Sequence, residues 1–444
     1  MHAAPEPTEL RWWAPWALPV SAKPARDVLV TVRDGRIAEL EGGVTRERAA
    51  SMPGVVLHDG CVIAPGFVNA HAHIEYAAYG ELVDGLSFAS WIGDHMHRKR
   101  RLSPEQVRAG AELGALQALH AGITCIGDAS FSGDAAHAMH AVGLRGRVYL
   151  EVFGGDDAAS ADAALETCLA RLAELPSSDR LHHGISPHAP YTVGEPLYRA
   201  VAATGLPWMT HVLESDAEVA YLSGHGELFD VTQARGFAFH DWRGRSPVQV
   251  LADVLGPEVV LVHHVHATPA DWEAIAASGA AVAHCPRSNA RLGCGVMDLD
   301  AADRAGVLVG LGTDSPASAG PLDPFAELRS AVELHRAVAR DAARPDLSRL
   351  LRAATVDAAQ ALGFADLGTI DVGSHADLVA VEVGTCDDPL VAYALGATPA
   401  DVRAVMLAGR DAGVSDRARL DAARERAQAA RTLLALPVRQ PAGR

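Results

Sequence analysis

Four hydrophobic runs of this chain each end in side chains that can bind a metal ion, and this repeated arrangement constrains the fold more than any other feature. The runs are residues 62–73, with His71 and His73, residues 207–211, ending in His211, residues 259–263, ending in His263, and residues 307–314, ending in Asp314. Apolar runs of this kind indicate buried strands. In a (β/α)8 barrel the carboxyl ends of the strands converge on one face. The chain is therefore predicted to be an α/β protein with a TIM barrel, in which these side chains meet.

The His-X-His pair suits metal binding because alternate side chains of a strand project to the same side. His71 and His73 can then both reach one ion, at about 2.0–2.1 Å each for zinc. Taken alone, such a pair can arise by chance among 21 histidines, and each polar strand end can be a cap or a satisfied core group. Four runs in this order predict one metal site at the barrel mouth.

Six motifs in this chain resemble those of the amidohydrolase superfamily, in its branch of cytosine, guanine and adenine-nucleoside deaminases and chlorohydrolases. They are PGFVNAHAH (65–73), SPHAPYTV (186–193), HVLESDAE (211–218), HHVHA (263–267), AHCPRSNARLG (283–293) and GLGTDSPAS (310–318). The resemblance extends from the first strands to about Arg410.

Strand patterns recur at both ends of the chain. Residues 28–32 and 37–40 flank an Asp34-Gly35 pair, a strong hairpin signal. Similar apolar segments return after residue 365. The resemblance implies that residues 1–64 and 365–410 form one small β-sandwich and that residues 65–364 form the barrel. Residues 104–121 and 326–339 are predicted barrel helices, and residues 411–444 a C-terminal helical segment.

The resemblance also implies a metal-ligand set of His71, His73, His211 and Asp314, with His263 outside it. One divalent ion is expected, with zinc first and iron or manganese as alternatives, because all three accept these donors. No lysine stands at the place where binuclear relatives bridge two metals. This absence favours one metal.

Three catalytic residues are expected at the same site. Asp314 is expected to accept a proton from the attacking water, whose pKa a bound metal lowers to about 7. By resemblance, His263 orients the attacking hydroxide. Glu214, three residues after His211, is expected to protonate a ring nitrogen and then pass a proton to the departing amine.

Four residues are expected to contact substrate. In adenine-deaminating relatives the counterpart of His188 contacts the purine, that of Trp91 borders the nucleoside, and that of Ser318 faces the substrate. Arg145 can pair with an anionic group. The basic run at 95–101 can meet the same anionic group. Trp91 is alternatively a core aromatic, and the basic run is alternatively a solvated helix face. That run lacks the glutamate with which relatives acting on S-adenosylhomocysteine bind ribose.

Overall, the chain resembles most the aminodeoxyfutalosine deaminases of menaquinone biosynthesis, whose substrate is an adenine nucleoside ending in a benzoate. The expected reaction is hydrolysis of 6-amino-6-deoxyfutalosine to futalosine and ammonia. Deamination of adenosine, S-adenosylhomocysteine or methylthioadenosine is the first alternative. Guanine deamination or aromatic dechlorination is the next. A metal-stabilised binding scaffold without catalysis is disfavoured, because it needs neither Glu214 nor His263.

The composition of the chain excludes several classes of partner and site. A net charge of −17 argues against nucleic acid as a partner. The 6 cysteines include no CxxC pair, so no disulfide framework or thiolate zinc site is indicated. No stretch predicts a membrane span or a signal peptide, which makes a cytoplasmic protein the expectation. A small purine nucleoside is the expected partner, and the resemblance admits a homodimer.

Overall fold

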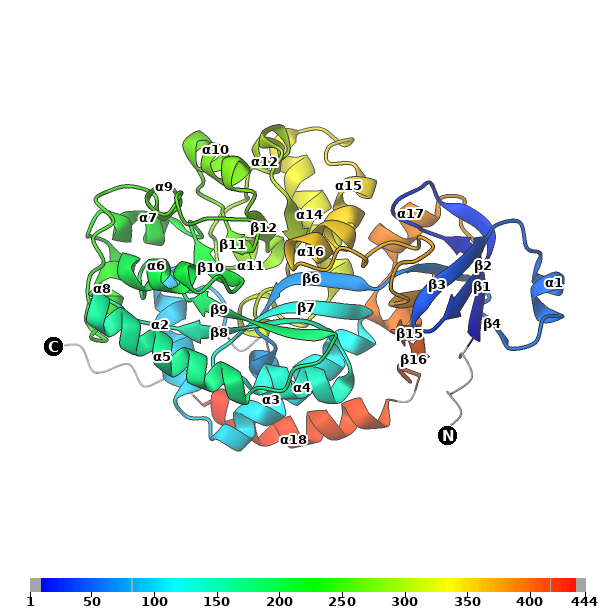
Figure 1. The fold of residues 1–444 in the computed structure, drawn as a ribbon, viewed down its shortest axis with the longest axis horizontal. Coiled ribbons are helices and arrows are strands. Elements are labelled where there is room, and N and C mark those ends of the chain that lie inside the picture. The colour runs from blue at the N-terminus through cyan, green and yellow to red at the C-terminus, as the bar shows by residue number, and fades with distance from the viewer. Residues whose placement is uncertain (1–8, 81–82, 416, 437–444) are drawn as a thin grey trace. The chain divides into compact units, whose positions relative to one another are not determined.

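Eight parallel strands form a sheet that closes into a barrel in the computed structural model, which describes residues 9–80, 83–415 and 417–436 (Figure 1). In chain order the strands are β6 (Phe67–Ala72), β7 (Ile123–Ser130), β8 (Arg145–Val152), β9 (Leu181–Pro187), β10 (Trp208–Val212), β11 (Val259–His263), β12 (Ala281–His284) and β13 (Val309–Leu311). Each strand pairs with the next one in the chain. A parallel bridge between Ala72 and Asp314 joins the last strand to the first. The predicted (β/α)8 barrel is confirmed.

The barrel strands are hydrophobic along almost their whole length because both of their faces are covered. Every residue of β6, β7, β10, β11, β12 and β13 is buried. Continuous rather than alternating apolar sequence is typical of parallel strands buried on both faces. The polar side chains at the strand ends are thus the exceptions that need an explanation.

The chain divides into two compact units. One comprises the described residues within 70–117, 126–322 and 418–444, and the other those within 1–69, 118–125 and 323–417. The domain boundaries expected from the sequence stay a prediction.

Most barrel helices belong to the first unit. Its helices are η1 (Ile74–Ala78), α2 (Phe88–Lys99), α3 (Pro104–His120), α4 (Asp134–Val142), α5 (Ala158–Glu174), α6 (Glu195–Ala203), α7 (Asp216–Leu222), α8 (Glu227–Gln233), α9 (Pro247–Val250), α10 (Pro269–Ser278), α11 (Pro286–Arg291), α12 (Leu299–Ala305), α13 (Pro316–Ala319) and α18 (Ala418–Leu434). Helix α3 confirms the helix predicted at 104–121.

The second unit contains a mixed sheet built from both ends of the chain, as the sequence predicted. The sheet order is β16-β15-β14-β5-β1-β2-β3, with β4 also paired to β1. The strands are β1 (Glu9–Ala17), β2 (Ala25–Arg33), β3 (Arg36–Glu41), β4 (Val55–Leu57), β5 (Cys61–Pro65), β14 (Leu378–Glu382), β15 (Val402–Leu407) and β16 (Arg410–Asp411). The helices are α1 (Arg46–Ala50), α14 (Pro324–Ala339), α15 (Leu347–Ala353), α16 (Val356–Ala361), α17 (Pro389–Val391), η2 (Ala392–Gly396) and η3 (Pro399–Asp401).

The predicted hairpin is present in this sheet. β2 and β3 pair antiparallel across Asp34 and Gly35, which have φ of 51° and 77°. Two consecutive positive φ angles define the tight turn whose twist suits a β-hairpin. The alternation of the strands gives the sheet two apolar faces: Trp12 belongs to one buried cluster and Trp13 to the other.

Helix α18 packs along one apolar stripe. Leu420, Ala423, Ala427, Ala430 and Leu434 are buried in a cluster that also contains Tyr76, Tyr79, Leu113 and Leu116. Their spacing of three and four residues places them on one face of the helix. Arg426, which flanks this stripe, pairs with Glu112 of α3.

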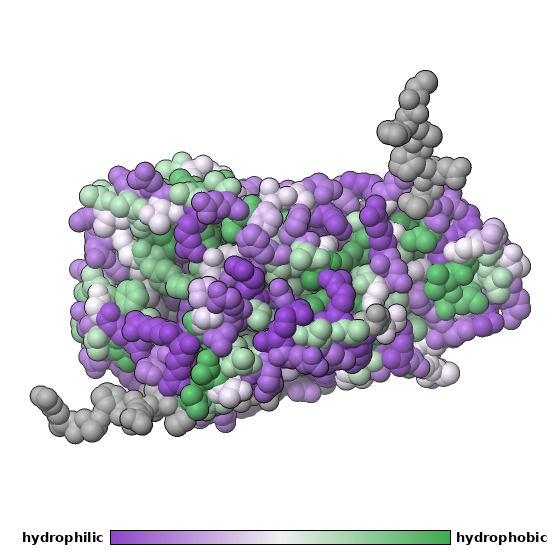
Figure 2. Space-filling view, turned by 90° about the horizontal axis from the view of Figure 1, so that it is seen from below, coloured by the Kyte–Doolittle hydropathy of each residue, from purple (hydrophilic) through white to green (hydrophobic). Residues whose placement is uncertain are grey.

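Figure 2 shows one face of the molecule, on which hydrophilic residues predominate and hydrophobic residues gather in separate groups. Among the described residues, no helix has both the length and the hydropathy needed to cross a bilayer.

Two glycines of α3 let this helix approach the segment that follows His73. A Cβ at Gly110 would overlap the Glu75 carbonyl oxygen, and one at Gly114 would lie 2.8 Å from the Ile74 Cβ. Real Cβ atoms do not come this close, so a side chain there forces η1 away from the helix.

Replacing Gly114 by alanine should therefore destabilise the protein. We expect a loss of about 1–3 kcal/mol in the free energy of unfolding, as for other overpacked sites, measured by urea unfolding followed by circular dichroism. Gly256→Ala is the matched control, because a Cβ there meets no atom within 4 Å. Equal stability of the two variants would contradict this packing argument.

Candidate active site

The four hydrophobic runs do bring their polar ends together at the carboxyl end of the barrel. His71 lies on β6 and His73 follows it, His211 lies on β10, His263 is the last residue of β11, and Asp314 follows β13. All five residues are buried, each with at most 7% of its surface exposed. Burial of so many polar groups requires that they be paired with one another or with a ligand.

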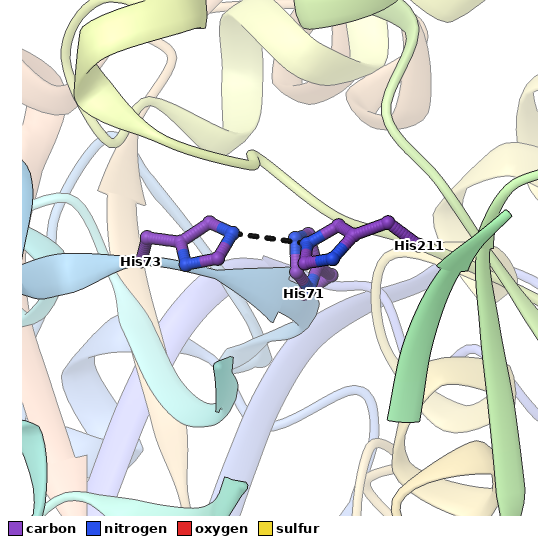
Figure 3. A group of neighbouring side chains, drawn as sticks. All are labelled: His71, His73 and His211. Carbon is purple, nitrogen blue, oxygen red and sulfur yellow. Dashed lines mark hydrogen bonds between the residues drawn. The ribbon is translucent and has the colours of Figure 1, made fainter. Parts of the chain in front are cut away.

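Backbone carbonyls fix the tautomers of two of these histidines. The Nδ1 of His73 lies 2.7 Å from the Ala129 carbonyl oxygen, and the Nδ1 of His211 lies 2.7 Å from the His188 carbonyl oxygen. A carbonyl only accepts, so each Nδ1 donates, and each neutral ring keeps its lone pair on Nε2. These two Nε2 atoms face each other at 3.1 Å, joined by the dashed line in Figure 3.

Two lone pairs at this distance repel each other unless a cation lies beside them. The third ring in Figure 3, His71, has a buried Nε2 with no hydrogen-bond partner among the described residues. This nitrogen lies 3.4 Å from Asp314 Oδ1, and His73 Nε2 lies 3.7 Å from the same oxygen. Three imidazole nitrogens and a carboxylate converging on one point are a tetrahedral donor set. The residues therefore fit a divalent metal ion.

The ionisation of the donors agrees with this fit. Burial lowers the pKa of His73 well below its usual value and that of His211 to about 4, so both rings are neutral near pH 7. Burial alone would raise the pKa of Asp314, but the adjacent His71 ring and the nearby His263 hold it well below the usual range. Neutral imidazoles and a carboxylate are the forms that bind metal.

Two site residues adopt strained backbone conformations. His263 has φ of 75° and Asp314 has φ of 55°, in the left-handed region that non-glycine residues seldom adopt. Backbone strain of this kind is characteristic of functional sites. In both cases it turns the chain directly after a barrel strand, where the side chain enters the site.

A glutamate and a histidine stand together beside the metal ligands. The Nε2 of His263 lies 3.5 Å from Glu214 Oε2. The Nδ1 of His263 lies 3.1 Å from the Asn289 amide nitrogen. That amide donates, so His263 carries its proton on Nε2. Burial, followed by the charges of Asp314 and Glu218, raises the pKa of Glu214 well above its usual value.

Supporting residues hold this arrangement in place. The Glu218 carboxylate accepts hydrogen bonds of 2.9 Å from the backbone nitrogens of Leu213 and Glu214. The Ser318 hydroxyl donates to Asp314 Oδ2 at 2.9 Å, and the Ser288 hydroxyl donates to the same oxygen at 2.5 Å. These contacts orient ligand and acid side chains, as outer residues of metal sites commonly do.

A cavity of about 450 Å³ opens in front of these residues. Its lining includes His73, His211, Glu214, His263 and Asp314. Apolar and aromatic side chains line much of the rest, among them Trp91, Ile92, Met96, Phe153 and Phe237. A pocket of this size, largely apolar with a few convergent polar groups, suits a small organic ligand.

The structure places two of the four predicted substrate contacts in the lining of the cavity. His188 and Trp91 line the cavity. Ser318 is bonded to Asp314 and is 1% exposed, so it supports the carboxylate rather than lining the cavity. Arg145 is the first residue of β8, at the end of the strand opposite the site, and is not among the lining residues that the structure describes.

The residues of the basic run at 95–101 have two different environments. Arg98 and Arg101 donate to backbone carbonyl oxygens at the end of α18, including Leu434 and Leu436. Lys99 and Arg100 line the cavity instead. Arg98 and Lys99 are the last two residues of α2, and Arg100 and Arg101 follow its end.

Sequence reasoning missed one acid in the cavity. Glu151 lies on β8 with only 5% of its surface exposed. The signal was present, since a charged residue interrupts the apolar stretch Val148–Val152 near a predicted strand end. Asn289 and Ser288 were also missed as individual contacts, although their segment SNARLG was part of a recognised motif.

The chain is similar to known proteins over most of its length. Residues 62–411 match the amidohydrolase family. The chain is 33% identical over 394 residues to a 5-methylthioadenosine/S-adenosylhomocysteine deaminase from Teredinibacter turnerae, covering 84% of each chain. It is similar in structure to an adenosine deaminase from Xanthomonas campestris with bound zinc, at 28% identity and a TM-score of 0.82, covering 97% of this chain and 100% of that one. An aminofutalosine deaminase from Helicobacter pylori in complex with methylthio-coformycin shares the fold, at 22% identity and a TM-score of 0.79, covering 90% and 99%.

Metal content tests the donor set directly. We expect purified His211→Ala protein to hold much less zinc after dialysis than the wild type, because one of the two facing nitrogens is lost. The measurement is plasma mass spectrometry of dialysed protein. His182→Ala, an exposed histidine of β9, is the matched control, and equal zinc in both variants would contradict the site.

Proposed function

Because this chain belongs to the amidohydrolase family, we propose that it is a metal-dependent deaminase of adenine nucleosides, with 5-methylthioadenosine or S-adenosylhomocysteine as its first candidate substrates. The observation that carries the proposal is the pair of facing Nε2 atoms of His73 and His211, with Glu214 and His263 beside them. A metal site next to a buried acid is the equipment that hydrolysis of an aromatic C–NH2 bond requires.

The chemistry divides among few residues. A divalent ion held by His71, His73, His211 and Asp314 would lower the pKa of water in the pocket to about 7. Side chains of the protein transfer the protons and position the attacking water. The Asp314 carboxylate takes the proton that the attacking water loses. The Nε2–H of His263 donates to the attacking oxygen and orients it toward C6 of the purine.

Glu214 acts on the leaving group. Its carboxyl group gives a proton to the ring nitrogen beside C6 as the C–O bond forms, which stabilises the tetrahedral adduct. The proton taken from water then goes to the amino group, the C–N bond breaks, and ammonia leaves. The C6 hydroxyl of the adduct gives its proton back to Glu214 as the carbonyl forms, which restores the acid. The product is the corresponding hypoxanthine nucleoside, and water is the only co-reactant.

The choice among adenine nucleosides rests on the relatives. Three curated relatives, at 32–34% identity, are named as deaminases of 5-methylthioadenosine and S-adenosylhomocysteine. They favour the alternative that the sequence left open over aminodeoxyfutalosine, which was our first expectation. The similarity to the aminofutalosine deaminase supports a common fold alone, because its identity is 22%.

One observation keeps a substrate with an anionic tail as a second candidate. Arg100 and Arg235 both line the cavity. Burial, and then the charge of Arg100, lowers the pKa of Arg235. Arg235 donates to the Gly93 carbonyl oxygen at 2.7 Å, and no acidic partner of either arginine is found in the described part of the chain. Such a pair fits a carboxylate, which S-adenosylhomocysteine and aminodeoxyfutalosine carry and methylthioadenosine lacks.

The test is deamination of each nucleoside by metal-replete enzyme. Adenosine, 5-methylthioadenosine, S-adenosylhomocysteine and aminodeoxyfutalosine are incubated separately, and the absorbance change from adenine to hypoxanthine is followed. We expect turnover of at least one of the thio-substituted nucleosides. Absence of turnover with all four, in protein shown to contain metal, would refute the proposed function.

Substitution of Arg235 tests whether the cavity binds a substrate with an anionic tail. Arg235→Gln should raise KM for the carboxylate-bearing substrates by about 10-fold or more, the value of one charged hydrogen bond, and leave KM for 5-methylthioadenosine unchanged. An equal effect on all substrates would mean that Arg235 supports the wall of the cavity and does not read the tail.

Glu214→Gln tests the acid. The variant should retain wild-type zinc content and lose about 10²–10⁴-fold in kcat, the usual contribution of a general acid. Glu166→Gln, an exposed glutamate of α5, controls for loss of a carboxylate elsewhere. Retained turnover in the Glu214 variant would refute the role given to this residue.

A further inference from the structure

One buried carboxylate in the cavity has no role in the reaction above. The Glu151 side chain is 3% exposed, lines the cavity, and comes from the strand next to the one that precedes His188. No hydrogen-bond donor reaches its oxygens from residues 9–80, 83–415 or 417–436. A buried carboxylate without hydrogen bonds costs several kcal/mol in the absence of a ligand. Its orientation into a cavity therefore points to a ligand with donors.

The nearest polar atom does not satisfy Glu151. The Nε2 of His188 lies 4.0 Å from Glu151 Oε1. The Nδ1 of His188 lies 2.8 Å from the Thr192 hydroxyl, which itself donates to the Ala189 carbonyl oxygen at 3.1 Å. The hydroxyl has one proton, so it accepts from His188, and His188 Nδ1 is the donor. The ring is then neutral with a bare lone pair on Nε2, and Glu151 and His188 present two acceptors side by side.

The ammonium group of Lys99 supplies a positive charge near Glu151. The Lys99 Nζ donates to the Tyr76 hydroxyl at 2.6 Å and lies 3.2 Å from the centre of the Phe131 ring. Burial raises the pKa of Glu151 to about 7, and Lys99 opposes this shift. Since Lys99 is anchored by Tyr76 and Phe131, it balances the charge of the carboxylate without blocking its oxygens.

Two adjacent acceptors require a ligand with two adjacent donors. An adenine nucleoside has donors in two places, the 6-amino group and the sugar hydroxyls. The amino group belongs at the metal end, beside Glu214 and His263. The 2′- and 3′-hydroxyls form a cis-diol that can give one hydrogen bond to each acceptor. We propose that Glu151 and His188 bind the ribose cis-diol of the substrate, which makes this site selective for ribonucleosides.

This inference rests on the proposed function, and its test separates the two. Wild-type enzyme, Glu151→Gln and Glu151→Leu are compared on adenosine and on 2′,3′-dideoxyadenosine. In the wild type, loss of the diol should lower kcat/KM on the order of 10²-fold, the value of a charged hydrogen bond. In the Leu variant the two substrates should react at rates within about 3-fold of each other, with the Gln variant between. Glu166→Gln is the matched control and should discriminate as the wild type does.

A binding measurement makes the result independent of turnover. Dissociation constants for inosine and 2′,3′-dideoxyinosine are measured by calorimetry for each protein, with equal zinc content and equal Tm as proof of folding. We expect the wild type to bind inosine on the order of 10²-fold more tightly than 2′,3′-dideoxyinosine. The Glu151→Leu variant should bind the two ligands with equal affinity.

The outcomes divide cleanly. Deamination without discrimination between the two nucleosides would overturn the diol site and leave the proposed function standing. Selective binding of inosine that depends on Glu151, without any deamination, would support the diol site and refute the proposed function. Discrimination that persists in Glu151→Leu would overturn the inference.

Discussion

The site depends on two histidine rings whose outer nitrogens point at each other because their inner nitrogens are tied to the backbone. His73 donates to the carbonyl of Ala129, on β7, and His211 donates to the carbonyl of His188, just after β9. Neither ring can turn or change tautomer without breaking a buried hydrogen bond. The backbone of neighbouring strands thus prepares a place for a cation, and the barrel is the scaffold that holds those strands in register.

The other polar groups of the site are also hydrogen-bonded by residues that lie close to them. Asp314 accepts from Ser318 through one oxygen and faces the histidines with the other, while Glu218 binds the backbone beneath Glu214. These contacts come mostly from loops after strands, where the chain bends sharply. Positive φ angles at His263 and Asp314 are part of the same bend. Strain in the backbone is offset by the pairing of buried polar groups.

The cavity brings charged groups of both signs together. Its lining includes Glu151, Lys99 and the arginines Arg100 and Arg235 as well as His211, Glu214 and Asp314. Ligand atoms of Glu151, His188 and His211 lie within 4.8 Å of one another. The buried carboxylate on β8 is therefore a close neighbour of the histidine cluster.

The sequence by itself determined the barrel, the hairpin at Asp34-Gly35, the terminal sheet and the polar residues that converge at the barrel mouth. These features depend on local patterns, namely apolar runs with polar ends and a turn pair that accepts positive φ. Only the tertiary structure decided that Arg145 lies away from the cavity, that Ser318 supports Asp314, and that Glu151 faces the cavity beside His188. The reason is physical: a strand pattern gives the face of a residue, but which end of the barrel it reaches, and which neighbours satisfy it, depend on strands far apart in the chain.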